Sequence, residues 1–276
     1  MCRSVPLPES PSLPGDDERR NGMAGTMATM SIEQQRAFAR DQGAVGANAH
    51  LLARHGSKFL VRRAHNLPLE VEGDRYVYLV VSGGLFLESQ LADGRRLIVN
   101  TYYPGDFVVP DPTVRLPKER LVVMKSGEVV RVRRRVFDTA LDDAADLARQ
   151  FRRALQLRSM REEVHAVVLG RLNGDERMAS YLIEAGRQYG TDVDGCVDIE
   201  LPMLRSEMAD YLALNSDTLS RLVTRLKSER IVRFIGRHRA VVEDWSQLVA
   251  RTPIADLLLA AYPEAARQVQ DAASER

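Results

Sequence analysis

A short polar break between two helical patterns constrains the fold of this chain more than any other feature. The break is Leu214-Asn215-Ser216-Asp217, inside the stretch ADYLALNSDTLSRLVTRLKSE that covers residues 209–229. Apolar residues recur on both sides at the spacing of packed helices; they are Ala209, Leu212, Leu214, Leu219 and Leu222. A turn of about three to four residues holds two such helices at a steep angle, which predicts a helix-turn-helix.

The second helix of this motif presents a polar and basic surface. Asn215 suits its N-cap, because the side-chain oxygen can accept a backbone N–H that the first turn of a helix leaves unpaired. In a helix-turn-helix, the N-terminal turns of the second helix face base edges in the major groove of DNA. We therefore predict a recognition helix over residues 216–228, with four base-contacting side chains: Ser216, Asp217, Ser220 and Arg221.

The charge of the chain becomes informative only when it is read locally. Over the whole chain, 39 Lys and Arg against 38 Asp and Glu give a net charge of +1, which indicates no partner. Between Arg205 and Arg239, eight basic residues stand against four acidic ones, and such an excess attracts phosphates. Residues 231–242, with Gly236 at their centre, predict a β-hairpin wing inside this basic segment.

Phosphate contacts position a protein on DNA without specifying the sequence that it reads. The residues predicted to make them are Arg205, Asn215, Arg225, Arg237 and Arg239. For Arg225 and Lys227, a solvated helix face is an equally weighted alternative.

The middle of the chain has the pattern of antiparallel strands. Residues 76–81 are β-branched and aromatic, and Ser82-Gly83-Gly84 ends them as a turn. Asp93-Gly94 marks a tight hairpin, and Pro104-Gly105-Asp106 marks a further turn. Short strands at this spacing, over residues 56–136, predict a sandwich or barrel rather than a parallel sheet.

A long helix is predicted after the strands. Residues 139–169 contain no proline or glycine, and a helix of that length measures about 45 Å, more than a small domain needs. Such a helix usually pairs with a twin through its apolar seam. The predicted dimer interface is Phe151, Leu155, Leu157, Met160, Val164 and Val167. The alternative is a long helix that lies over its own barrel.

The order of barrel, long helix and winged helix-turn-helix resembles the CRP/FNR family of bacterial transcription regulators. The stretch LPMLRSEMADYLALNSDTLSRLVTRLKSERIV, residues 201–232, is similar to the FNR/FixK branch, where the recognition helix reads roughly E-T-V-S-R. VYLVVSGGLFLESQLADGRRLIVNTYYPGDFV, residues 77–108, resembles the β-roll of the family. Together the resemblance covers about residues 50–245.

The resemblance implies roles for single residues. Arg221 aligns with an arginine that reads guanine, and Asp217 with a glutamate that accepts from a cytosine amino group. Ser220 aligns with the serine of the FNR-type helix, and Ser216 with its variable neighbour. Three positions depart from the family: Asp217 is one methylene shorter than the glutamate, Leu204 replaces a Ser or Thr cap, and Arg230 replaces a glycine.

The sensory part lacks the signatures of known effectors. Cyclic-nucleotide binders of the family have a Gly-Glu and a short helix after the PGD turn, whereas this chain has no Gly-Glu there, and Pro110, Pro112 and Pro117 oppose an ordinary helix. Arg115 or Arg120 could still meet an anion, although a surface charge is the more common role. Two cysteines are too few for a four-cysteine iron–sulfur cluster, and the five histidines form no haem motif. We therefore predict no cofactor and leave the signal open.

Other classes of protein find little support in the sequence. None of the motifs of P-loop enzymes, serine hydrolases, zinc proteases or dinucleotide-binding enzymes occurs, so no enzyme is predicted. The acidic run Asp138, Asp142, Asp143 and Asp146 is interpreted as the start of a helix rather than as a metal site. Two cysteines and no apolar run of membrane-spanning length favour a reducing, cytoplasmic location without membrane contact.

The expected fold class is α+β: an N-terminal antiparallel β-roll, a long dimerisation helix and a C-terminal winged helix-turn-helix. The predicted boundaries are 1–30 for a disordered leader, 31–138 for the β-roll with N-terminal helices, 139–169 for the long helix, 170–250 for the DNA-binding domain and 251–276 for a helical extension. The expected function is a homodimeric regulator on a near-palindromic site in double-stranded DNA, with RNA polymerase as a further partner if it activates. The alternatives are a small-effector sensor whose DNA binding strictly needs the effector, or a protein-interaction module.

Overall fold

The computed structural model describes residues 45–110 and 116–263. All described residues belong to a single compact unit. The predicted leader, Arg115 and the end of the C-terminal extension lie outside the described residues. Residues 45–53 form a helix, within the segment where short helices are expected.

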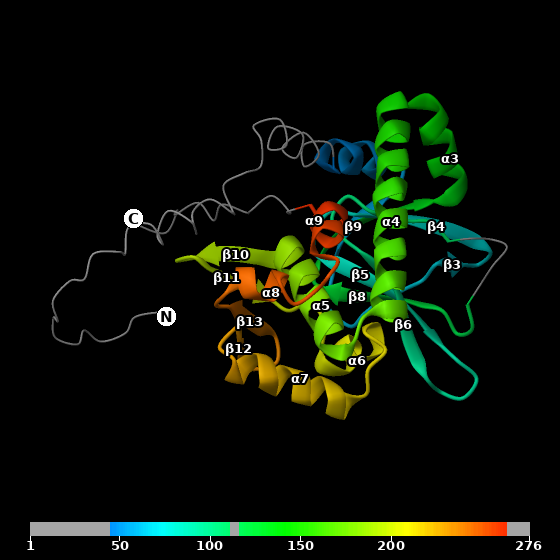
Figure 1. Ribbon diagram of the computed structural model, residues 1–276. Coiled ribbons are helices and arrows are strands. Elements are labelled where there is room, and N and C mark those ends of the chain that lie inside the picture. The colour runs from blue at the N-terminus through cyan, green and yellow to red at the C-terminus, as the bar shows by residue number, and fades with distance from the viewer. Residues whose placement is uncertain (1–44, 111–115, 264–276) are drawn as a thin grey trace, which may run out of the picture. The chain divides into compact units, whose positions relative to one another are not determined.

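The first part of the described chain is a β-roll of two antiparallel sheets (Figure 1). One sheet has the order β1-β9-β4-β3 with β7 paired to β4, and the other has the order β2-β8-β5-β6. The strands are β1 (Ser57–Val61), β2 (Asn66–Leu67), β3 (Glu70–Val71), β4 (Asp74–Val80), β5 (Gly84–Gln90), β6 (Arg96–Tyr102), β7 (Phe107–Val108), β8 (Arg120–Lys125) and β9 (Gly127–Arg133). The predicted antiparallel barrel is confirmed.

The predicted turns of the roll need glycine for steric reasons. Gly83 has φ +80°, and a Cβ there would lie 2.6 Å from the carbonyl oxygen of Lys125. Gly94 and Gly105 have φ +89° and +93°, in the hairpin between β5 and β6 and in the PGD turn. Side chains with a Cβ rarely adopt this conformation, so these glycines determine where the strands reverse.

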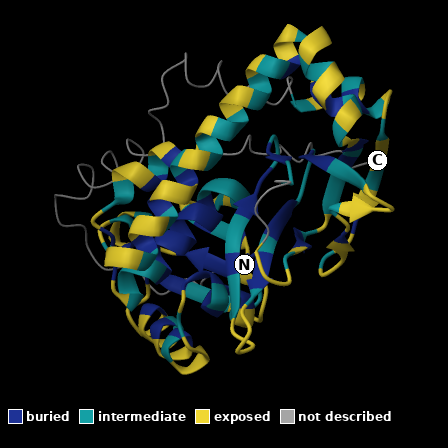
Figure 2. Cartoon of the chain, turned by 90° about the vertical axis from the view of Figure 1, so that its right-hand side faces the viewer, coloured by how far each residue is buried: buried dark blue, intermediate teal, exposed yellow. Residues whose placement is uncertain are grey.

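Alternating side chains of the central strands enter two different cores. Tyr78 and Val80 of β4 lie between the two sheets, whereas Val77 and Leu79 lie on the other face, with Phe137 and Leu147. A strand that is covered on both faces has no need of polar residues, which explains the uninterrupted apolar run of β4. Figure 2 shows buried strands in the interior and helices whose exposed and buried residues alternate.

The long helix begins later than the sequence predicts. The predicted segment contains the end of one helix, α3 (Arg134–Asp143), and most of a second, α4 (Ala145–Arg171). Ala144 between them is extended, with φ −123° and ψ 93°. The prediction of one helix over 139–169 is therefore wrong at its N-terminal end.

Charge and aromatic packing explain the break at Ala144. Asp142 and Asp143 lie in the last turn of α3, where acidic groups oppose the helix dipole, whereas Asp146 lies favourably in the first turn of α4. Our interpretation of the acidic run as a helix start is thus correct only for Asp146. Folding back also brings Phe137 of α3 against Phe151 of α4, with ring centroids 5.1 Å apart.

A winged helix-turn-helix follows α4. α5 (Gly174–Tyr189) precedes the hairpin of β10 (Gly190–Val193) and β11 (Cys196–Glu200). α6 (Arg205–Tyr211) and α7 (Ser216–Ser228) form the helix-turn-helix, and β12 (Val232–Ile235) and β13 (Arg239–Val242) form the wing. The four strands make one sheet in the order β10-β11-β13-β12, so the wing is joined to the domain by β11.

The C-terminal extension packs into the molecule. α8 (Trp245–Val249) and α9 (Ala255–Ala261) follow the wing, and α9 packs against α4 and α5. Leu258, Ala261 and Tyr262 are buried in the same core as the helix-turn-helix. The predicted extra helix is confirmed for α9, and its described part braces the DNA-binding domain.

Candidate nucleic-acid interface

The turn between α6 and α7 is built by backbone geometry and one side-chain cap. Ala213 adopts φ +50°, and the N–H of Leu214 donates to the carbonyl of Ala209 at 2.9 Å, which closes α6. Asn215 then caps α7, because its Oδ1 accepts the N–H of Thr218 at 2.7 Å. The predicted helix-turn-helix, its cap and the extent of the second helix are confirmed.

One side of α7 is apolar and docked, and the other is polar and exposed. Leu219, Leu222 and Leu226 are buried in the core that α7 shares with α5 and α6. The four predicted base-reading residues all lie on the exposed side: Ser216, Asp217, Ser220 and Arg221. The structure thus brings together the side chains that the sequence singled out, on one face of one helix.

Two hydroxyl groups on this face, those of Ser220 and Thr224, have their protons engaged. Ser220 Oγ donates to the Ser216 carbonyl at 2.8 Å, and Thr224 Oγ1 donates to the Ser220 carbonyl at 3.0 Å. Their oxygens therefore offer lone pairs outward, which suits acceptance from the amino groups of adenine or cytosine. Arg221 forms no ion pair within the part of the chain that the structure describes, so its guanidinium is available as the donor of this face.

The predicted phosphate-contacting residues differ in their surroundings. Arg225 forms an ion pair with Asp175 of α5, and Arg239 donates from Nε to Asp198 of β11 at 2.7 Å. Arg205 stacks over the Phe234 ring at 4.7 Å, and its burial lowers the pKa of the guanidinium. Asp175 and Asp198 are missed by sequence reasoning, because each lies far along the chain from its arginine.

The remaining phosphate candidates are the exposed Arg237 at the wing and Asn215 at the start of α7. Asn215 already uses its side-chain oxygen for the cap, so only its amide NH₂ is left for a phosphate. In the sequence, Asn215 precedes α7 and Arg237 follows it.

The predicted dimer seam is only partly available to a partner. Val164 is 5% exposed and lies in the core of its own chain, and Phe151 packs edge-on against Phe107 with centroids 5.3 Å apart. Neither side chain is therefore available to a partner, because Phe151 packs against the roll and Val164 packs against α5 and α9 of its own chain. Met160 packs against the same core as Val164, whereas Val167 is 38% exposed. Leu155 and Leu157 are half-buried.

The PGD turn is tied to α4 by a buried ion pair. Arg161 Nη2 lies 2.5 Å from Asp106 Oδ1, and Asp106 Oδ2 accepts the N–H of Tyr103 at 2.8 Å. Burial disfavours the charge of Arg161, but the neighbouring Asp106 carboxylate raises the pKa of the guanidinium above its usual range. The pairing joins the roll to α4 at the turn that ends before β7.

A buried cluster of tyrosines surrounds Glu184 where the roll, α5 and α6 meet. Tyr211 donates to Glu184 Oε2 at 3.0 Å, and Tyr103 donates to Glu184 Oε1. Burial raises the pKa of Glu184 to about 7, although the tyrosine hydrogen bonds oppose that rise. No sequence signal marks this cluster, because its members come from four separate segments of the chain: Tyr103, Glu184, Tyr211 and Tyr262.

His165 of α4 is also enclosed within the chain. Its ring stacks on Tyr211 with centroids 4.2 Å apart, and burial, with a contribution from Arg177, lowers the pKa of the imidazole to about 4. Within residues 45–110 and 116–263, no group of three or more His, Cys, Asp or Glu side chains is placed to hold a metal ion. Among the described helices, none is both long and apolar enough to cross a membrane.

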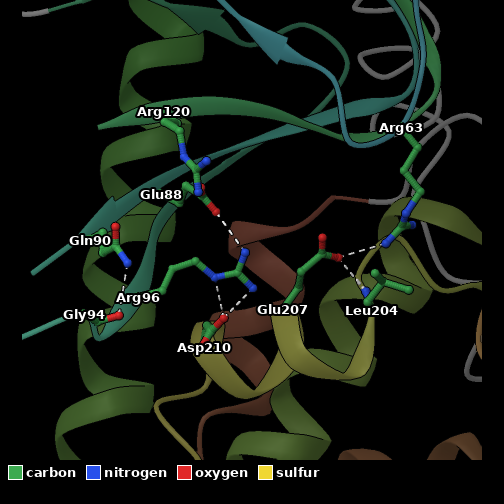
Figure 3. A network of polar contacts seen from close by, with 9 residues as sticks. All are labelled: Arg63, Glu88, Gln90, Gly94, Arg96, Arg120, Leu204, Glu207 and Asp210. Carbon is green, nitrogen blue, oxygen red and sulfur yellow. Dashed lines mark hydrogen bonds and ion pairs between the residues drawn. The ribbon is translucent and has the colours of Figure 1, made fainter. Parts of the chain in front are cut away.

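The roll has an open cavity of about 560 Å³ beside β2 and β8. Lys118 and Arg120 line it together with Glu70, Glu119 and several apolar residues. Arg120 is not a free surface charge, because it forms an ion pair with the buried Glu88 (Figure 3).

Comparison with known proteins agrees with this architecture. Residues 176–251 match the Crp-like helix-turn-helix domain. The nitrogen fixation regulation protein FixK of Azorhizobium caulinodans is 28% identical over 217 residues, which cover 78% of this chain and 86% of that protein. The transcriptional activator protein FnrL of Cereibacter sphaeroides is 28% identical over 185 residues, 64% of this chain and 73% of that protein.

The structure of FixK2 from Bradyrhizobium japonicum superposes with a TM-score of 0.60 at 28% identity, and the match covers 71% of this chain and 97% of that one. The similarity thus includes the β-roll and α4 as well as the helix-turn-helix.

Proposed function

Because this chain belongs to the CRP/FNR family and is a DNA-binding transcription regulator, we propose that it binds as a homodimer to a near-palindromic site through α7. The observation that carries the proposal is the exposed polar face of α7, with Arg221 in the second turn of a well-capped helix. It acts on double-stranded DNA in the cytoplasm, with no catalytic step. If it activates, RNA polymerase is a further partner.

The base contacts follow from the chemistry of this face. Arg221 donates two hydrogen bonds to O6 and N7 of guanine, a contact worth about 1–3 kcal/mol of discrimination. Asp217 and Ser220 accept from amino groups of cytosine or adenine, and Ser216 reads a neighbouring position. Arg205, Asn215, Arg225, Arg237 and Arg239 are the proposed phosphate contacts.

Two of these phosphate contacts need a change of partner. Arg225 and Arg239 each leave an aspartate, Asp175 or Asp198, when a phosphate approaches. Both arginines are exposed, and solvent screening makes such ion pairs weak, so the exchange costs little.

The dimer is proposed to form along the side of α4 that faces away from its own roll. Leu155 and Val167 are the apolar members of that side, with Leu157 and Met160 at its margin. α4 has 27 residues, and at about 1.5 Å per residue this is long enough to place two recognition helices roughly one DNA turn, about 34 Å, apart.

Selection of random DNA by the purified protein without added effector tests the proposal. The expected result is a two-fold site with TGA-containing half-sites, which also shows that no small effector is obligatory. Binding that is independent of salt and of sequence contradicts the proposal, because phosphate neutralisation makes affinity fall steeply with salt.

A further inference from the structure

Two arginines of the β-roll hold the first helix of the helix-turn-helix (Figure 3). Arg96, the first residue of β6, donates from Nε to the Asp210 carboxylate at 2.7 Å, and its Nη2 lies 2.6 Å from the same oxygen. Arg63, just after β1, donates from Nη2 to Glu207 at 2.8 Å and from Nη1 to the carbonyl of Pro202 at 2.6 Å. Glu207 and Asp210 both belong to α6, so the roll holds this helix at two points.

Arg96 is itself fixed from inside the roll. The side chain of Glu88 is only 3% exposed, and its Oε2 lies 3.2 Å from Arg96 Nη1. The other oxygen of Glu88 is taken by Arg120. A buried carboxylate needs its charged partners, so Glu88 restricts Arg96 to the position in which it reaches Asp210.

Glu207 links the roll to the start of α6. Its Oε2 accepts the N–H of Leu204 at 2.6 Å, which caps the helix where the side chain of Leu204 offers no acceptor. The same oxygen accepts from Arg63. The position of the first turn of α6, which carries Arg205, is therefore set together with the contact to the roll.

This contact orients the reading helix without covering it. Phe86, Ile98 and Met124 of the roll share one core with α5, α6 and α7. The polar face of α7 stays exposed, and none of its four base-reading residues takes part in the contact. The arginines therefore affect the orientation of α7 and not the exposure of its polar face.

We propose that Arg63 and Arg96 are positioning residues for DNA recognition: they set the angle between α7 and α4, and with it the half-site spacing that the dimer accepts. A small rotation of α6 moves α7 along the DNA axis, whereas the base contacts depend on the side chains of α7 itself. The preferred half-site spacing and the base preference within each half-site can therefore be changed independently by mutation. The inference rests on the proposed homodimer.

The test measures binding to a series of DNA duplexes with constant half-sites and a spacer that changes by one base pair at a time. Asp210→Asn and Arg96→Gln are each expected to reduce the preference for the wild-type spacer over its neighbours by about fivefold, the equivalent of a partly exposed ion pair. The base preference within each half-site stays unchanged. Asp210→Glu, which keeps the carboxylate, is expected to retain the spacer preference.

Arg95→Gln is the matched control. Arg95 is adjacent to Arg96 and pairs with Asp93 inside the hairpin between β5 and β6, so its loss leaves α6 untouched. If Arg96→Gln fails to fold because Glu88 loses a partner, Asp210→Asn decides the matter, since it removes only the partner on α6.

Two outcomes overturn the inference while the homodimer stands. One is an unchanged spacer preference in folded Asp210→Asn, and the other is an equal loss of affinity at every spacer length. A wild-type protein that selects single half-sites with no spacer preference refutes the proposed homodimer, and the inference falls with it.

Discussion

At the scale of single residues, we expect DNA recognition to depend on which arginines of α7 are free and which are paired. Arg221 is exposed on the reading face, whereas Arg225 is held by Asp175. Arg221→Ala should lower affinity for the selected site by about 1–3 kcal/mol, because a bidentate guanine contact is lost. Affinity for scrambled DNA should change much less. Titrations of both duplexes against the variant and against Arg95→Ala measure the difference, and an equal loss on the two duplexes removes Arg221 from base reading.

Glu184 supplies a second prediction at this scale, on the dependence of stability on pH. Its pKa in the folded protein is raised to about 7 by burial, against a usual 4.5. The folded state therefore prefers the protonated form of Glu184. The stability that this preference adds to the folded state is fully present below about pH 4.5 and is lost as the pH rises through 7. Between pH 5 and 8 the free energy of unfolding should fall by about 2 kcal/mol through this group alone.

Glu184→Gln keeps the hydrogen-bonding shape but does not titrate, so it separates this group from the other carboxyl groups. Denaturant unfolding of both proteins at several pH values measures the difference between them. The same slope with pH in wild type and variant shows that the carboxylate is stabilised in place by Tyr103, Tyr211 and Arg161.

At the scale of elements, α7 depends on its N-cap. Asn215→Ala should lower the free energy of unfolding by about 1 kcal/mol, since the Thr218 N–H loses its acceptor. It should also weaken specific DNA binding, because the first turn of α7 carries Ser216 and Asp217. The comparison is Asn173→Ala, which removes the cap of α5, where Asn173 Oδ1 accepts from Glu176 at 3.1 Å. A similar loss of stability but a smaller loss of specific binding is expected there; identical effects on DNA binding from both caps contradict the prediction.

At the scale of the whole molecule, the outward side of α4 is the proposed dimer interface. Val167→Glu places a charge on that side and should shift the protein toward the monomer, because a charge buried without a partner is costly. Affinity for the two-fold site should fall by more than about tenfold. Leu60→Glu changes the 78% exposed Leu60 of β1 in the same way and should have neither effect. Sedimentation of the three proteins measures their mass, and a dimeric Val167→Glu places the interface elsewhere.

Local patterns were sufficient for much of the fold. The strands, the glycine turns, α7 with its Asn215 cap and the wing were all predictable, because each depends on neighbours in the chain. The break at Ala144 was not, since helix propensity continues through it and the competing contact joins Phe137 to Phe151. For the same reason, apolar periodicity located α4 but could not tell that Val164 faces its own core.

Local sequence patterns predict the β-roll, the long helix, the winged helix-turn-helix and the side chains that α7 exposes. These properties follow from periodicity, turn chemistry and capping, which act over a few residues. The pairing of the arginines, the burial of Glu184 and the contact between the roll and α6 depend instead on the folding of distant segments against one another. Arg96 and Asp210 lie 114 residues apart. No local pattern predicts their contact, because it forms only when the folded roll packs against the folded helix-turn-helix.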